Sequence, residues 1–159
     1  MNEKSLKYQR QALSPVLFKL GMWKSLPSVA FWGITIDVLE ETQCHVKIPF
    51  MWRTQNPFGS IYFAALAGAA ELSTGALCQM MIKGRGDYSM LIVGFKAEFL
   101  KKATSTIIFV CDQGQHLSDL LDGMKQKGDT ARLEMKAIGK NVDGEIIGSA
   151  TIDWSFKRK

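Results

Sequence analysis

The segment 60–82 constrains the fold more than any other part of this chain. It is apolar on nearly every side and holds one charged side chain, Glu71, so a helix formed here must be buried on most of its sides. Its many small residues and the charge at its middle are poor features for a membrane span. The glycines of Gly84–Asp87 then supply a helix stop. We therefore predict one long central helix over residues 60–82, wrapped by the rest of the chain.

Strands are predicted on both sides of this helix. Period-two alternation of apolar and polar residues, or a short continuous apolar run, is typical of a strand. A polar turn at residues 40–43 and the Asp143–Gly144 pair predict two hairpins. The expected strands cover about residues 31–38, 44–50, 90–100, 106–111, 131–139 and 145–156.

Two helical additions complete the pattern. Residues 1–27 are predicted to be an N-terminal helical extension, whose helix from about residue 5 to residue 20 is interrupted at Pro15. Residues 116–127 are predicted to form a small amphipathic helical insertion. The chain shows no internal repeat and no linker, and its 159 residues are enough for one core. We therefore expect a single domain over residues 1–159.

An antiparallel sheet wrapped around one buried helix is an α+β architecture. Several of the predicted strands, the fourth and the last above all, also carry apolar residues on their second face. Such a face needs a covering layer, and a second subunit is the simplest one. The pattern therefore predicts a homodimer, or a tetramer.

Composition narrows the classes of function. The net charge of +5 is modest, and the features of a base-stacking sheet are missing, so we expect no nucleic-acid binding. A basic surface also suits a ligand that carries phosphates. Cys44, Cys78 and Cys111 are odd in number and lack the spacing of metal ligands, which predicts free thiols and no metal site. Because no signal segment precedes them, we expect a cytoplasmic protein.

Glu71 is the first candidate for chemistry. A carboxylate in the middle of an apolar helix is rare unless it is paired, hydrogen-bonded or functional. Low-dielectric surroundings would raise its pKa and make it a better base near neutral pH. The structural alternative is that Glu71 points out at the one wet edge of the helix, or pairs with a basic residue across an interface.

The loop before the helix is the second candidate. Asn56–Gly59 leads into the helix start, where backbone N–H groups can stabilise a developing oxyanion. A glycine lets a ligand approach the backbone closely, and Asn56 can hold the loop or bind the ligand. Ordinary turn chemistry explains the same residues without a ligand. Tyr62 leaves two alternatives open, since its hydroxyl can contact substrate or its ring can simply pack.

The segment from Asn56 to Glu71, with the strands around it, resembles the acyl-CoA thioesterases of the hot-dog superfamily, in their phenylacetyl-CoA thioesterase-like branch. Asn56, Gly59 and Glu71 stand at the matching positions of the family pattern. Where the family places His-Gly-Gly, this chain has Tyr62-Phe63-Ala64, as in the group of thioesterase-like hot-dog proteins with a substituted motif. The resemblance implies a hot-dog fold and an antiparallel sheet around the central helix.

The resemblance also implies a function, the hydrolysis of acyl-CoA-type thioesters with no cofactor beyond the coenzyme A of the substrate. Glu71 would act as general base or nucleophile, with Asn56 and Gly59 beside it. The backbone of residues 62–64 would polarise the carbonyl. The helix start of one subunit would face the helix of the other, so that the two parts of the site meet across the interface.

The remaining assignments are coarser. Lys83 and Arg85, or Lys101, are expected to hold the phosphates of the substrate. His45 and His116 show no catalytic context, and Cys78 is expected to be core. The rival function is a non-catalytic hot-dog module that binds an acyl-CoA or a lipid, which the Tyr62-Phe63-Ala64 substitution favours. Hydrolysis of an acyl-CoA panel would distinguish the two.

Overall fold

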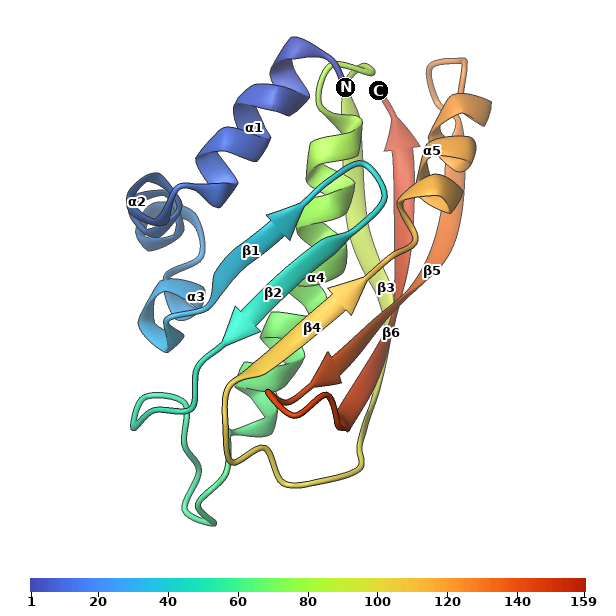
Figure 1. Ribbon diagram of the computed structural model, residues 1–159. Helices are drawn as coiled ribbons and strands as arrows, with labels where there is room; N and C mark the ends of the chain where they lie inside the picture. The colour runs from blue at the N-terminus through green and yellow to red at the C-terminus, as the bar shows by residue number, and fades with distance from the viewer.

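The apolar central helix forms as α4 (Phe63–Ile82), and the sheet curls around it (Figure 1). The computed structural model describes all residues, 1–159. Its six antiparallel strands are ordered β1-β2-β4-β5-β6-β3 in one sheet. The strands are β1 (Thr35–Leu39), β2 (Cys44–Ile48), β3 (Tyr88–Phe99), β4 (Ile107–Cys111), β5 (Thr130–Lys140) and β6 (Ile146–Arg158). The predicted α+β arrangement of one wrapped helix is confirmed.

The helix α4 starts at Phe63 rather than at residue 60. The backbone N–H of Ile61 donates to the carbonyl of Ala103, and that of Tyr62 donates to the carbonyl of Thr54. These bonds keep the two residues extended, because their donors already have partners outside the helix. Along the rest of α4 the residues facing the sheet are buried. The helix is long and apolar enough to cross a membrane, but most of it is enclosed by the protein's own core.

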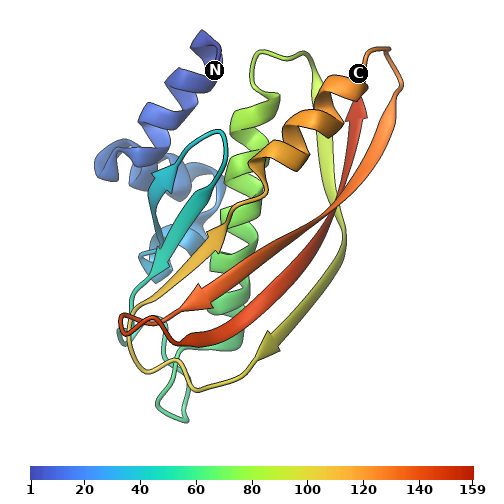
Figure 2. The same cartoon turned by 45° about the vertical axis from the view of Figure 1, so that its right-hand side comes forward.

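The long strands β5, β6 and β3 curve around one side of α4 (Figure 2). The predicted hairpin between β5 and β6 is present, with Gly144 at a positive φ of 81° in its turn. At the edge of the sheet, β3 pairs with β6 along one side only, so twelve residues of strand leave their other side unpaired. An open edge of this length is a ready template for pairing with another strand.

The N-terminal region forms three helices, α1 (Glu3–Leu13), α2 (Pro15–Ser25) and α3 (Pro27–Trp32), which gather beside β1 and α4 (Figure 1). Ser14 ends α1 and caps α2, where Pro15 occupies the first turn.

The strand expected from about residue 31 begins at Thr35, because Phe31 belongs to α3. Pro27 starts that helix, and Gly33 ends it in the left-handed conformation with a φ of 70°. The helical region therefore extends to residue 32. The small insertion forms as α5 (Gly114–Gly123), a few residues earlier than expected.

The first turn of α1 is fixed to the last turn of α4. The Ser5 hydroxyl shares its proton between the carbonyls of Met80 and Lys83, at 2.9 and 2.8 Å. The Asn2 side-chain amide donates to the same Lys83 carbonyl at 2.7 Å. Since the last carbonyls of a helix lack partners inside the helix, these bonds satisfy them and set the position of α1 along α4.

Candidate functional site

Glu71 lies near the middle of α4 and is half-buried. Its carboxylate takes part in no ion pair and no hydrogen bond within the chain, although burial raises its pKa above the ordinary value. An unpartnered carboxylate in a poorly solvated position is energetically costly, which marks it as a candidate for proton transfer. No basic residue of the same chain pairs with Glu71, so an ion pair would have to come from across an interface.

The surroundings of Glu71 hold its carboxylate along the helix. A Cβ added to Gly75, one turn further on, would lie 2.8 Å from Glu71 Oε1 and 3.3 Å from a ring carbon of Trp154. Trp154 Nε1–H donates to Thr74 Oγ1 at 2.9 Å, and the Thr74 hydroxyl donates to the Glu71 carbonyl at 2.9 Å. The glycine leaves room for the carboxylate, and the buried indole fixes the backbone that carries it.

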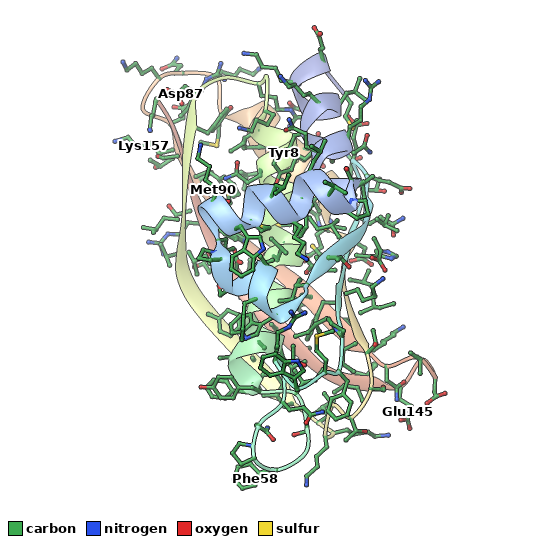
Figure 3. The ribbon with its side chains drawn as sticks, turned by 90° about the vertical axis from the view of Figure 1, so that its left-hand side faces the viewer. Tyr8, Phe58, Asp87, Met90, Glu145 and Lys157 are labelled. Carbon is green, nitrogen blue, oxygen red and sulfur yellow. The ribbon has the colours of Figure 1, made fainter.

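Tyr8 of α1 packs against the core. Burial, with smaller contributions from Cys44, Glu71 and Cys78, raises the pKa of the Tyr8 phenol to about 12. The Tyr8 hydroxyl makes no hydrogen bond within the chain. Figure 3 shows Tyr8 between α1 and α4. Tyr8 was not predicted as a site residue from the sequence, although Ser5, Tyr8 and Ala12 recur at helical spacing and mark the face of α1 that packs inward.

The loop before α4 is organised by Asn56. Its side-chain carbonyl accepts hydrogen bonds from the N–H groups of Phe58 and Ser60, at 2.9 and 3.3 Å, and its amide donates to Ser60 Oγ at 3.1 Å. Gly59 has a φ of 72°, a conformation that favours glycine, and open space where a side chain would be. In this protomer Asn56 therefore holds the loop, the first of the two roles considered for it.

The start of α4 offers two free backbone donors. Tyr62 is the N-cap but makes no side-chain cap, and the N–H groups of Phe63 and Ala64 donate to no group in the chain. Free N–H groups at a helix N-terminus are suitable donors to an oxyanion. Of the backbone donors expected at residues 62–64, those of Phe63 and Ala64 are free, whereas the Tyr62 N–H already donates to the Thr54 carbonyl. The Gly59 N–H donates to the Asn56 carbonyl and is not free either.

A cavity of about 590 Å³ opens beside these donors. Tyr62 and Phe63 stand at its wall with exposed rings in edge contact, their centroids 5.0 Å apart. Lys101 and Lys102 come from the segment after β3. Lys101 is paired with Glu145 at 2.8 Å, whereas Lys102 has no acidic partner. The cavity is lined by Asn56, Pro57, Phe58, Ser60, Ile61, Tyr62, Phe63, Leu66, Phe99, Leu100, Lys101, Lys102 and Ala103.

Lys83 and Arg85 lie at the other end of α4. A helix of 20 residues is about 30 Å long, so within one protomer these cations are far from the loop cavity. Arg85 donates to the Ser118 hydroxyl at 2.8 Å and pairs with Asp122 at 3.5 Å. The structure thus brings Lys101 and Lys102 to the loop cavity, but not the two cations expected there first.

Glu71 and the free donors do not converge on one point within a protomer. Glu71 follows Phe63 by two turns of α4, a separation of about 12 Å along the helix axis. A group that contacts the Phe63 N–H therefore lies beyond the direct reach of Glu71 of the same chain.

Other reactive groups are not arranged for catalysis. The three cysteines are free and buried, and burial raises the pKa of the Cys111 thiol to about 11, so it is protonated at neutral pH. No group of three or more His, Cys, Asp or Glu side chains is placed to hold a metal ion. Glu71, Tyr8 and the helix start are therefore the candidate groups of the site.

Similar architectures occur in solved structures. A protein of unknown function from Pseudomonas aeruginosa, for which thioesterase activity has been suggested, shares 18% identity over 92% of this chain and 97% of its own, with a TM-score of 0.74. A Haemophilus influenzae thioesterase shares 14% identity over 87% of this chain and 88% of its own, with a TM-score of 0.67. A Staphylococcus aureus thioesterase shares 14% identity over 81% of this chain and 97% of its own, with a TM-score of 0.64. These similarities confirm the hot-dog fold.

The sequence comparisons are more specific about family. No curated protein matches the chain. Residues 15–156 match the family described as a domain of unknown function, DUF4442. Because this match covers most of its length, the chain belongs to the DUF4442 family.

Proposed function

We propose that the protein hydrolyses acyl-CoA-type thioesters at a site formed between two copies of the chain. The observation that carries this proposal is Glu71, a half-buried carboxylate of raised pKa without a partner in its own chain. The shared fold with proteins named thioesterases supports it. The three free, buried cysteines suit a reducing compartment, and we propose the cytoplasm.

The proposed dimer forms through the open edge of β3. This strand exposes Leu91, Val93 and Phe95 beside its unpaired backbone groups, so a second copy would cover apolar surface and complete the hydrogen bonds together. Two-fold pairing of identical edge strands would place the helices α4 of both copies on the same face of a continuous sheet. Each helix start would then face the neighbouring helix, which is the arrangement that the separation of Glu71 and Phe63 requires.

In the proposed reaction, Glu71 removes a proton from water while the water oxygen bonds to the thioester carbonyl carbon. The N–H groups of Phe63 and Ala64 from the other copy stabilise the oxyanion. The carbon–sulfur bond then breaks, the thiolate takes the proton back from Glu71, and a carboxylic acid and a free thiol are released. Direct attack by the Glu71 carboxylate is the other route, through an anhydride that water hydrolyses.

Lys102 is the cation that we assign to the phosphates of coenzyme A, with Lys101 beside it. Both lie on the rim of the loop cavity, and Lys102 is free of acidic partners. Within the protomer these residues take the role expected of Lys83 and Arg85, which stand at the far end of the helix.

A non-catalytic acyl-binding module is the second candidate. It is favoured by Phe63, whose side chain is 58% exposed at the cavity wall, next to the donors that a carbonyl would have to reach. A bulky ring there can hold a ligand at a distance from the helix start.

The test is incubation of the purified protein with a panel of aliphatic and aromatic acyl-CoA thioesters, with thiol release measured alongside ligand binding. Hydrolysis that depends on protein concentration is expected. Stable binding of an acyl-CoA with no thiol release would favour the module, and neither binding nor release would contradict both functions.

A further inference from the structure

The helix α2 is unusual because it is apolar and yet largely exposed. Phe18 is its one buried residue, while Val16 and Leu20 are 67% and 63% exposed and Trp23 is half-exposed. Only Phe18 and the partly buried Met22 of α2 pack on the core. The exposed apolar side chains of this helix are unfavourable unless something covers them.

Between α1 and α2 lies an apolar groove with a volume of about 260 Å³. Ala12 lies on its α1 side, and Leu17, Phe18 and Met22 lie on its α2 side. None of the lining residues is charged. A cavity of roughly 150 Å³ with such a lining is enough to hold benzene, so this groove is large enough for a longer hydrocarbon group.

Tyr8 connects the groove with the core around α4. It lines the groove and packs against the buried core, and Glu71 is among the groups that raise the pKa of its phenol. The bonds from Ser5 to the end of α4 hold α1 in this position. Tyr8 and Gln11, the polar lining residues, make no side-chain hydrogen bonds in the chain. A group bound in the groove would therefore contact Tyr8, on the face of α1 that packs toward α4, the helix that carries Glu71.

We propose that the groove between α1 and α2 binds the hydrocarbon part of the acyl group, and that the N-terminal helices set the acyl-chain preference of the protein. This inference rests on the proposed thioesterase function and extends it to the substrate class: an uncharged, extended acyl chain. The apolar lining excludes the phosphates of coenzyme A, which bind at the loop cavity. Each methylene buried in the groove strengthens binding by about fourfold.

Substitution of Gly21 with a larger residue would fill part of the groove. Gly21 lines the groove from α2, and a Cβ added there meets no atom within 4 Å. Gly21→Leu therefore adds a side chain to the groove from a position whose Cβ has open space, and replacing a helical glycine does not weaken the helix. Gly123→Leu is the matched control, since Gly123 is also a helical glycine with open space around it but lies at the end of α5.

The experiment measures kcat/KM for straight-chain acyl-CoA thioesters of increasing length, and the dissociation constants of the matching non-hydrolysable thioethers. For long chains, Gly21→Leu is expected to lower kcat/KM and to raise the dissociation constant, each on the order of tenfold. This is the effect of losing one to two methylenes of contact. Short chains should change by less than about twofold, and Gly123→Leu should behave as wild type.

The outcomes separate this inference from the proposed function. An unchanged length profile in folded Gly21→Leu overturns the groove assignment while thioester hydrolysis stands. If wild type hydrolyses no thioester, but Gly21→Leu loses the dependence of thioether binding on chain length, the groove assignment is supported and the proposed thioesterase function is contradicted. If Gly21→Leu instead changes the mass by light scattering and leaves the profile unchanged, the groove is a contact between copies and the inference is wrong.

Discussion

The two ends of α4 are built in opposite ways. At the C-terminal end, Asn2 and Ser5 satisfy the carbonyls of Met80 and Lys83. At the N-terminal end, no side chain caps the helix, and the N–H of Phe63 faces a region with a large cavity. A helix end that is fully bonded contributes stability, whereas one with free donors can bind a ligand. Changes at the C-terminal end of α4 should therefore alter the stability of the fold, and changes at its N-terminal end should alter catalytic activity.

The largest effect is expected from Glu71→Gln, which keeps the size of the side chain and removes the base. The kcat for a good acyl-CoA substrate should fall by about a hundredfold or more. In wild type, burial raises the pKa of Glu71, and a general base works when deprotonated. The activity should therefore rise with pH through a midpoint above the ordinary glutamate value of 4.5, and initial rates across a pH series should show this limb disappear in the variant.

Phe63→Pro tests the free N–H donors at the N-terminal end of α4. Proline has no N–H, it suits the first position of a helix, and Tyr62 before it already has the extended conformation that proline requires, with φ −62° and ψ 132°. The loss of one oxyanion donor should lower kcat by about a hundredfold with little change in Tm.

Phe63→Ala is the matched control for this change, because it removes the same ring and keeps the N–H. It should retain activity within a few-fold of wild type. Equal losses in both variants would show that the ring matters and that the backbone donor does not.

Ser5→Ala tests the C-terminal end of α4, where the carbonyls have partners. It removes the hydroxyl that is bonded to buried carbonyls of α4, so the free energy of unfolding should fall by about 1–3 kcal/mol. Ser25→Ala, whose exposed hydroxyl bonds within α2, should change it by less than about 0.5 kcal/mol. Urea titration measures both. A Ser5→Ala variant as stable as Ser25→Ala would contradict the role assigned to this end.

The fold was predictable because its signals are local. The alternation in the strands and the apolar composition of 60–82 depend on neighbouring residues, and both are confirmed. The boundary near Phe31 was wrong, because Pro27 and Gly33 set the limits of a short helix within an apolar segment that has no clear period. The late start of α4 depends on hydrogen bonds that Ile61 and Tyr62 donate to the carbonyls of Ala103 and Thr54, of which the first is distant in sequence and the second lies in a loop.

The site was only partly predictable, because some of its features are local in sequence and others depend on packing between distant segments. Glu71 stands out in the sequence as the lone charge of its helix, and the free donors follow from the helix start. Tyr8 acquires its place only when α1 packs along α4. The distance of Lys83 from the loop follows from helix length, which places one end of α4 about 30 Å from the other. Whether a second copy brings the two parts of the site together is a property of assembly.

The most direct test of a shared site is complementation between two inactive variants. Glu71→Gln retains an intact helix start, and Phe63→Pro retains an intact carboxylate. If each site takes Glu71 from one copy and the donors from the other, a mixed dimer holds one complete site. The two variants, unfolded together and refolded at equal concentrations, should then regain about a quarter of wild-type activity, since half of the dimers are mixed and each has one working site. Activity no higher than that of either variant alone, in a mixture shown to contain mixed dimers, would contradict the account.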